Sequence, residues 1–387
     1  MGGEDTSGTP IRLLKSAASS ITSGRVSRRD VNGRNPLYGS TGQIGATNLV
    51  EFSGPSILVA RVGANAGSVY RVDGQYGVSD NTLVIRPAAN QDVDFLTEVL
   101  RHANLNRMVY GSGQPLVTGT MLKSLEIPDL PLVSQRRIAV ALGDVDALLA
   151  TLGRLIAKKQ AVKQGLAQQL LTGSTRLPGF SGTWGEASLG EISAPITKGA
   201  TPTTYGFAWE SSGIPFLRSE CVSECGLDMR RSMFISPAAH HALRRSRVAG
   251  GDILVTITGY VGRVARLVNI SEANINQHIA RVRIKDDRFD SGYIYHYLSQ
   301  RSMREYYESI VTGQAYPQIS LAQVRDTKIP VIPFDEQQAI AAALDDADGE
   351  MDLLRQRLAK AQRVKKGVMQ ELLTGRTRLP VRGEGSE

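Results

Sequence analysis

The feature that most constrains this 387-residue chain is a repeat at one constant offset. The segment IPDLPLVSQRRIAVALGDVD, residues 127–146, aligns with IPVIPFDEQQAIAAALDDAD, residues 329–348. In the same register, KKQAVKQGLAQQLLTGSTRLP, residues 158–178, aligns with KAQRVKKGVMQELLTGRTRLP, residues 360–380. Roughly half of the positions in this block are identical, far more than chance allows at a fixed offset. Duplication is the simplest explanation, so the fold should contain two copies of one layout.

Each copy carries a stripe of mostly apolar residues that recur in steps of four and three. This heptad spacing is typical of a coiled coil, and the obvious partner of each helix is the other copy, paired antiparallel. A helix of roughly 37 residues would be about 55 Å long and could act as a spacer. Lys159, Lys163 and Lys365 interrupt the stripe; they either specify register, mark a protein contact or lay their aliphatic stems along the seam. The expected seam positions are Ile138, Leu142, Val145, Leu149, Leu152, Ile156, Leu166 and Leu170, then Ile340, Leu344, Ala347, Met351, Leu354, Leu358, Ala361, Val368 and Leu372.

A domain precedes each helix. The two domains have diverged more than the helices, and the pattern they share is weaker than the helical repeat. SILVARVGANAGSVYRV, residues 56–72, resembles DILVTITGYVGRVARLV, residues 252–268, and each predicts two strands around a glycine-containing turn. Helical stretches are expected at 92–110 and 290–310, followed by short helices capped by Thr118 and Ser320. The sequence therefore predicts an α+β fold, with two strand-rich domains separated by two long helices that pair as an antiparallel coiled coil, in a pseudo-twofold internal repeat.

The expected boundaries follow from proline, glycine and capping residues. Ser134 and Asp335 suit the starts of the long helices, and Gly173 and Gly375 suit their ends. The predicted segments are a first strand-rich domain at 1–133, a first helix at 134–173, a linker at 174–183, a second domain at 184–334, a second helix at 335–375 and a tail at 376–387.

Composition and missing motifs exclude several classes of protein. No apolar stretch approaches the roughly 18 residues of a membrane span, and no secretory signal is visible, so a cytoplasmic location and no membrane partner are expected. Cys221 and Cys225 cannot close a zinc site alone, and no metal motif or P-loop occurs, so we expect no catalytic residue, metal or cofactor on this chain. Carboxylates such as Asp146 and Asp348 are expected to favour the dipoles of the long helices rather than catalysis.

The net charge of +8 makes a polyanionic partner worth considering. Arg and Lys pair guanine, Asn and Gln pair adenine, and all of these side chains can hold phosphate. Asp80, Asn81, Asn276 and Gln277, at strand entrances, could instead satisfy turn backbone. The nucleic-acid-binding candidates in the first domain are Arg25, Arg28, Arg29, Arg34, Tyr38, Ser40, Gln43, Arg61, Asn65 and Gln114. Those in the second domain are Lys198, Thr201, Tyr205, Arg218, Arg230, Arg244, Arg247, Tyr260, Arg263, Gln314, Tyr316 and Gln318.

The layout resembles the specificity subunits of type I restriction-modification systems over nearly the whole chain. The resemblance rests on LLTGxTRLP at the end of each helix, the W-x(4)-L-G-E-I pattern of Trp184 to Ile192 and the KGATPT stretch from Lys198. GIPFLRSE from Gly213, GDILVTITGYVGRVA from Gly251 and TGQAYPQIS from Thr312 add to it. The second half is the stronger match, because the first has no tryptophan-containing start of this kind.

The resemblance implies that this chain is a non-catalytic subunit that binds double-stranded DNA. Each target-recognition domain would read one half of a split site, and the helices would set the gap and dock two modification subunits. S-adenosylmethionine would then be carried by those subunits, and ATP and magnesium by the restriction subunits of the full complex. Two alternatives stay open: a stand-alone enzyme acting on DNA with an unrecognised site, and a coiled-coil scaffold whose domains bind something else.

Overall fold

The computed structural model describes residues 10–26, 29–108, 115–224, 226–313 and 316–373. The chain divides into two compact units, the first made of residues 1–154 and 356–387 and the second of residues 155–355. Each unit therefore holds one strand-rich domain and a part of both long helices. This division differs from the expected string of consecutive segments, because an antiparallel helix pair places the start of one helix beside the end of the other.

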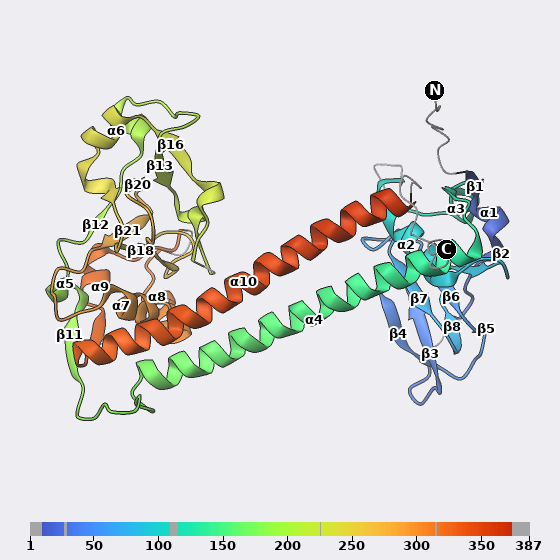
Figure 1. Cartoon of the computed structure of the whole chain (residues 1–387), viewed down its shortest axis with the longest axis horizontal. Helices are drawn as coiled ribbons and strands as arrows, with labels where there is room; N and C mark the ends of the chain where they lie inside the picture. The colour runs from blue at the N-terminus through green and yellow to red at the C-terminus, as the bar shows by residue number, and fades with distance from the viewer. Residues whose placement is uncertain (1–9, 27–28, 109–114, 225, 314–315, 374–387) are drawn as a thin grey trace, which may run out of the picture. The chain divides into compact units, whose positions relative to one another are not determined.

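The first unit is built on two four-stranded sheets (Figure 1). Its elements in chain order are β1 (Ile11–Leu13), α1 (Leu14–Ala17), β2 (Ala18–Ser23), β3 (Asn35–Gly39), β4 (Gly42–Thr47), β5 (Phe52–Ser53), β6 (Ser56–Ala60), β7 (Val69–Val72), β8 (Gln75–Val78), β9 (Thr82–Pro87), α2 (Val93–His102), η1 (Leu105–Met108), α3 (Gly119–Lys123), β10 (Glu126–Pro128) and the first part of α4 (Leu132–Leu171). The sheet orders are β2-β9-β6-β7 and β4-β3-β8-β5, and β1 pairs with β10.

The second unit repeats this plan with additional short elements. Its elements after α4 are β11 (Gly185–Ser188), α5 (Leu189–Ile192), β12 (Thr197–Lys198), η2 (Pro202–Tyr205), β13 (Ile214–Leu217), η3 (Ser219–Cys221), β14 (Val222–Ser223), β15 (Gly226–Leu227), η4 (Met229–Arg231), β16 (Met233–Ile235), α6 (Pro237–Ala242), η5 (Arg244–Ser246), β17 (Arg247–Val248), β18 (Ile253–Thr256), β19 (Val264–Arg266), β20 (Ala273–Ile275), β21 (Ile279–Val282), α7 (Ser291–Leu298), α8 (Arg301–Ser309), α9 (Leu321–Arg325), β22 (Lys328–Val331) and the first part of α10 (Phe334–Leu373).

The strand orders of the two units match one for one. The order β12-β21-β18-β19 corresponds to β2-β9-β6-β7, and β16-β13-β20-β17 corresponds to β4-β3-β8-β5. In both units the one parallel pairing among the described strands falls at the same place, β3 with β8 and β13 with β20. The expected α+β fold with an internal repeat is therefore confirmed, and the duplication extends into domains whose sequences have diverged.

The first domain also contains the structural counterpart of the start around Trp184. In the second unit β11 pairs with β22 and leads into α5; in the first unit β1 pairs with β10 and leads into α1. The Arg176 guanidinium carbon lies over the Trp184 ring, 5.5 Å from the ring centroid. Arg176 follows the end of α4. The tryptophan is thus a contact particular to the second unit, whereas the strand and helix that follow it are common to both.

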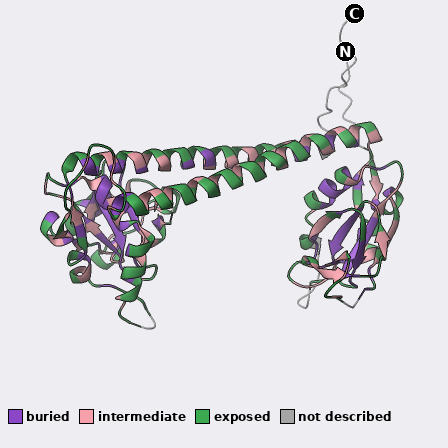
Figure 2. Cartoon of the chain, turned by 90° about the horizontal axis from the view of Figure 1, so that it is seen from below, coloured by how far each residue is buried: buried purple, intermediate pink, exposed green. Residues whose placement is uncertain are grey.

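Each core is a sheet, a helix and the long-helix pair packed in that order. In the first unit Phe95 and Leu100 of α2 lie between Ile57 and Ile85 of the sheet and Leu142 of α4. In the second unit α7 lies in the same way between β18 and β21 and the residues of α10 around Leu344. Figure 2 shows the buried strands at the centre of each domain and the mostly exposed outer faces of the long helices. Burial of these aliphatic and aromatic side chains is the main stabilising contribution.

The two long helices have 40 residues each and run antiparallel within each unit. In the first unit Ile138 and Leu142 of α4 share a core with Leu372 of α10. In the second, Leu170 of α4 shares a core with Ile340 of α10. Every predicted seam position is buried or half-buried, as are the three lysines that interrupt the stripe.

The lysines in the seam form ion pairs across the helix pair. In the first unit the Nζ of Lys365 lies 2.7 Å from both carboxylate oxygens of Asp146, and in the second unit the Nζ of Lys163 lies 2.6 Å from Asp348. Lys163 and Lys365 are equivalent in the repeat, as are Asp146 and Asp348, so the two pairs are reciprocal. Lys159 pairs with Glu350 in addition. These contacts favour the register role over the alternatives, because each lysine meets a carboxylate of the opposite helix.

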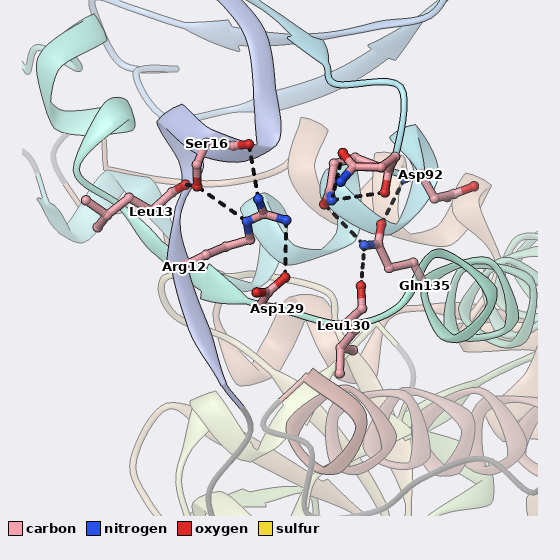
Figure 3. Close-up of polar contacts among 9 residues, drawn as sticks. Arg12, Leu13, Ser16, Asp92, Asp129, Leu130 and Gln135 are labelled. Atoms are coloured by element: carbon pink, nitrogen blue, oxygen red, sulfur yellow. Dashed lines mark hydrogen bonds and ion pairs between the residues drawn. The ribbon is translucent and has the colours of Figure 1, made fainter.

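A buried glutamine joins each strand-rich domain to its long helix. Gln135, which has no exposed surface, accepts a hydrogen bond from the Asp92 N–H at 2.9 Å and donates to the carbonyl of Leu130 at 2.8 Å and to Gln91 Oε1 at 3.2 Å. Figure 3 shows these contacts beside the pair formed by Arg12 and Asp129. Asp92 caps α2, so one side chain joins the start of α4, the strand-end segment before it and the start of α2.

The same arrangement recurs at Gln337 in the second unit. Its amide accepts from the Asp290 N–H at 2.9 Å and donates to the carbonyls of Ile332 and Arg288, both at 2.9 Å. Asp290 caps α7 as Asp92 caps α2. A buried amide with its donors and acceptor all used is a strong positional constraint, because any shift of helix against domain would leave buried polar groups unpaired.

The second unit has a charged contact at a position of the long helix where the first unit has a glycine. Asp345 of α10 lies 2.7 Å from Arg266 and 2.8 Å from His296 Nε2 of α7. Burial opposes ionisation of this carboxyl, but the hydrogen bonds from His296 and Arg266 lower the pKa of Asp345 to about 2. The equivalent residue in the first unit is Gly143, whose surroundings are open. There Arg71, the counterpart of Arg266, pairs with Asp94 and Asp73 instead.

Several local expectations are corrected. The helix expected at 92–110 ends at His102 and is followed by η1, and the helix expected at 290–310 is interrupted, giving α7 and α8. The long helices begin two residues before Ser134 and one before Asp335, at the residue after a proline. Gly173 has the left-handed φ of a helix end, whereas Gly375 and the tail lie outside the described residues.

The helix-dipole interpretation of the carboxylates is also wrong. Asp146 and Asp348 lie several turns into their helices, beyond the first turn where the dipole acts, and they pair with lysines instead. Thr118 and Ser320 do cap their short helices, as expected. Cys221 is a free, fully buried thiol whose pKa is raised by burial, and Cys225 lies outside the described residues.

We predict that Gln337→Ala will destabilise the chain by about 1–3 kcal/mol, because it leaves the buried N–H of Asp290 and two carbonyls without partners. Gln338→Ala, the exposed neighbour, is the matched control and should change stability by less than about 0.5 kcal/mol. Urea unfolding followed by circular dichroism measures both. Equal effects of the two substitutions would contradict the assigned role of Gln337.

We predict a pH-dependent effect of Asp345→Asn. Since the folded-state pKa of Asp345 is below its ordinary value, its contribution is fully present above about pH 5 and is lost as the pH falls towards 2. The variant should be less stable than the parent by about 1 kcal/mol at pH 7, because the carboxyl is partly exposed and screened. Thermal melting from pH 7 to pH 2 should show the two curves converging, and Asp346→Asn, an exposed neighbour, should follow the parent throughout. A difference for Asp345→Asn that persists unchanged to pH 2 would contradict this account.

Candidate nucleic-acid interface

The loops at one end of the first sheet in each domain bring many of the predicted side chains together. In the second domain this end is formed by the exit of β12, the turn between β18 and β19, the link between β20 and β21, and residues 316–318. Backbone hydrogen bonds hold these loops to one another: the Ile257 N–H donates to His278, and Gly259 donates to Pro317, at 2.9 and 3.0 Å. Thr258 and Gln318 form an isolated bridge. The gathered candidates are Lys198, Thr201, Tyr260, Arg263, Tyr316 and Gln318, while Tyr205 is exposed at the end of η2.

The first domain gathers the equivalent loops. The Arg61 N–H donates to Asn81 at 2.9 Å, and the Arg61 carbonyl accepts from Val117 at 2.8 Å, so the β6–β7 turn contacts both the β8–β9 link and the loop before α3. Arg25 follows the exit of β2. Val62 and Leu116 form the isolated bridge that corresponds to Thr258 and Gln318. The candidates brought to this end are Arg25, Arg29, Ser40, Arg61 and Asn65.

A glycine at the exit of β2 and of β12 allows this close assembly of loops. A Cβ at Gly24 would lie 2.2 Å from the Val78 carbonyl oxygen, and one at Gly199 would lie 1.8 Å from that of Ile275. No other residue fits such a close approach of two backbones. Packing therefore requires a glycine at this position in both domains, Gly24 in the first and Gly199 in the second.

The first domain has a small polar cavity beside these loops. It has a volume of about 340 Å³ and is bounded by the β3–β4 turn, the β8–β9 link and the segment after β2. Arg29 and Ser40 line it together with Asp80 and Asn81. Asp80 and Asn81 thus face a cavity, while Asn276 of the second domain accepts from the His278 N–H and satisfies turn backbone. Gln277 Oε1 accepts from the Thr201 hydroxyl at 2.6 Å.

Not all candidates lie at this end of the sheet. Tyr38 packs edge-on against Tyr76 with ring centroids 5.9 Å apart, and Arg34 and Gln43 are exposed elsewhere on the second sheet and its approach. In the other domain Arg218 lies near Glu220, and Arg230 forms a two-point pair with Asp228 at 2.8 and 3.1 Å. The carboxylate offsets the charge of Arg230, so this arginine is a weaker phosphate contact than its type suggests.

A second group of positive charges spans both sheets of the second domain, with Arg247 on β17 and Arg281 on β21. The Arg247 guanidinium donates to the carbonyls of His240 and His241, and Arg281 donates to the Arg247 carbonyl at 2.9 Å. Burial, followed by the charge of Arg283, lowers the pKa of Arg281. Arg244 is exposed on η5. Arg281 was missed by sequence reasoning, because it alternates with buried residues in a strand and resembles an ordinary sheet position.

The candidate cations are largely uncompensated by carboxylates. Within the described part of the chain, no ion pair involves Arg25, Arg29, Arg34, Arg61, Lys198, Arg244, Arg247 or Arg263. Side chains that keep an uncompensated positive charge can contact a polyanion. Arg28, Gln114 and Gln314 lie outside the described residues, so their predicted roles stay predictions.

The described residues contain no cluster of three or more His, Cys, Asp or Glu side chains arranged to hold a metal ion. Among the described helices, none is both long and apolar enough to cross a membrane.

Comparison with known proteins agrees with this geometry. The model of the type I restriction modification DNA specificity domain matches the chain twice, over residues 21–161 and 182–363. The chain therefore belongs to the family of type I restriction-modification specificity proteins, with two copies of its DNA specificity domain. This outcome matches the main interpretation of the sequence and neither of the two alternatives.

Relatives and solved structures show the same likeness. The chain is 27% identical over 317 residues, 77% of its length and 72% of the relative's, to a protein of Methanocaldococcus jannaschii named as the MjaX type I restriction enzyme specificity subunit. It is 24% identical over 341 residues, 84% of its length and 79% of the relative's, to the MjaVIII specificity subunit of the same organism. The crystal structure of a type I S subunit from M. genitalium covers 96% of this chain and 98% of that one with a TM-score of 0.68 at 18% identity, which shows the shared fold.

Proposed function

We propose that this chain is the subunit that gives a type I restriction-modification complex its DNA sequence specificity. Each recognition domain would read one half of a bipartite site in double-stranded DNA, and the chain itself would carry out no chemistry. The observation that carries this proposal is the repetition of one loop assembly on matching sheets with different side chains at its surface. Two equal scaffolds with unequal loops suit the reading of two different short sequences.

The long helices supply the separation between the two readings. Buried glutamines set the place of each domain on its helix, and reciprocal lysine–aspartate pairs set the register of the helix pair within each unit. A bipartite site with a fixed gap needs such constraints, because a gap that varied would place the second domain over the wrong bases.

The outer face of α4 suits a protein partner. Aliphatic side chains recur on it with near-heptad spacing and are between 38% and 65% exposed, namely Val133, Val140, Leu148, Leu155 and Val162. Such a stripe on a helix favours docking of further helices. We assign it to the modification subunits, two of which would bind the helix pair and supply S-adenosylmethionine; ATP and magnesium would belong to restriction subunits of the full complex. All of these would act in the cytoplasm, where the DNA is.

Selection from a randomised duplex library tests the proposal, with the chain assembled with its cognate modification subunit. We predict enrichment of two short motifs separated by one fixed gap. Binding should weaken steeply with salt, with log K falling by about 0.9 per phosphate contacted for each tenfold rise in salt. Enrichment of one continuous motif, of no motif, or binding indifferent to salt would contradict the proposal.

A further inference from the structure

The turn between β18 and β19 is held in one conformation by a buried threonine. Thr256 has no exposed surface; its hydroxyl donates to the Tyr260 carbonyl and accepts from the Arg263 N–H at 2.9 Å. Gly259 and Gly262 have φ of 77° and 78°, which only glycine adopts readily, and the Gly259 N–H bonds to Pro317 across the neighbouring loop. The turn is therefore fixed from inside by Thr256 and from outside by the loop at 316–318.

This turn presents a stacked pair of side chains. The Arg263 guanidinium carbon lies 3.9 Å from the centroid of the Tyr260 ring, and Tyr260 is 62% exposed. Within the described residues, Arg263 makes no ion pair. Stacking on the Tyr260 ring fixes the plane of the Arg263 guanidinium group before binding, so little side-chain entropy is lost on binding.

The first domain has none of these three residues at the equivalent positions. Strand pairing matches Ile57–Arg71 with Ile253–Arg266 and so places Ala60 at the position of Thr256 and Ser68 at that of Arg263. Ala64 is the counterpart of Tyr260, in a turn longer by one residue. The Thr256, Tyr260 and Arg263 set is therefore particular to the shorter turn of the second domain.

We propose that Arg263 recognises a guanine in the half-site read by the second domain, with Tyr260 holding the guanidinium plane and Thr256 acting as the positioning residue. In the major groove guanine alone presents two acceptors, O6 and N7, to a two-point arginine contact. The Arg263 guanidinium, which is oriented by stacking and makes no ion pair, matches these two acceptors. This inference rests on the function proposed above and adds the base that one residue reads.

Library selection with the assembled complex tests the inference, comparing the parent with Arg263→Ala and Arg263→Lys. The parent motif should contain a guanine in one half, and Arg263→Ala should reduce the preference for it roughly tenfold to hundredfold, while the other positions keep theirs. Arg263→Lys keeps the charge but loses the fork, so it should restore affinity more than base preference. Arg301→Ala removes one exposed arginine of α8, paired with Glu305, and should leave the motif unchanged.

The positioning role of Thr256 has its own comparison. Thr256→Val removes the hydroxyl without changing the volume and should weaken the same guanine preference, whereas Thr256→Ser keeps the hydroxyl and should preserve it. A general loss of folding would instead lower all binding equally, which circular dichroism of both variants detects. Arg61→Ala, in the first domain, should affect only the other half of the motif.

Three outcomes overturn the inference in different ways. A uniform loss of binding in Arg263→Ala with an unchanged motif would mean a phosphate contact and not base reading. A bipartite parent motif with no guanine that responds to Arg263→Ala would overturn the inference and leave the proposed function standing. No enriched motif with the parent complex would overturn the proposed function and the inference together.

Discussion

The rest of the structure depends on one buried amide in each half of the chain. Gln135 and Gln337 each join a long helix, the strand-end segment before it and the capped start of the domain helix. Hydrophobic packing alone would tolerate some sliding of a domain along its helix, because apolar contacts are not directional. A fully hydrogen-bonded amide does not, since displacement leaves several buried groups without partners. The position of each reading surface is therefore fixed by polar contacts and stabilised by the apolar core around them.

Duplication explains why the ion pairs in the seam are reciprocal. An antiparallel pair of equivalent helices places each lysine of one copy opposite an aspartate of the other, so one favourable contact in the ancestor yields two in this chain. The two domains have meanwhile diverged at their attachments. Asp345 ties α10 to Arg266 and His296 in the second unit, whereas Gly143 leaves the corresponding space open in the first. The scaffold is conserved between the halves where register matters and differs where it does not.

The sequence predicted the parts of the fold that depend on periodic patterns. The heptad stripe identified both long helices, proline and capping residues gave their starts to within two residues, and the glycine-containing turns identified the β6–β7 and β18–β19 hairpins. It did not predict that the helix beginning at Val93 ends at His102 or that the stretch from Ser291 divides into α7 and α8, because tertiary contacts override local propensity at helix ends. The sequence also did not predict the matching strand orders of the sheets, because strand pairing between distant segments leaves little trace in sequences that have diverged.

The candidate interface was less predictable than the fold. Residue type pointed to arginines on loops, but it could not tell Arg263, which is stacked and makes no ion pair, from Arg230, which Asp228 neutralises. Thr256 and Arg281 carried no signal, since a buried threonine and a strand arginine are ordinary in sheets. Pairing and burial, which are properties of the assembled loops, decide which side chains remain available to a ligand.

The central claim is that this chain alone determines which bipartite site its complex recognises. Genome-wide mapping of adenine methylation at single-base resolution tests it most directly, in cells that carry the chain with its cognate modification subunit and in cells that lack only this chain. The account predicts that a motif with two short halves and a fixed gap loses its methylation when the chain is absent. An unchanged methylation pattern, with the modification subunit demonstrably active, would contradict it.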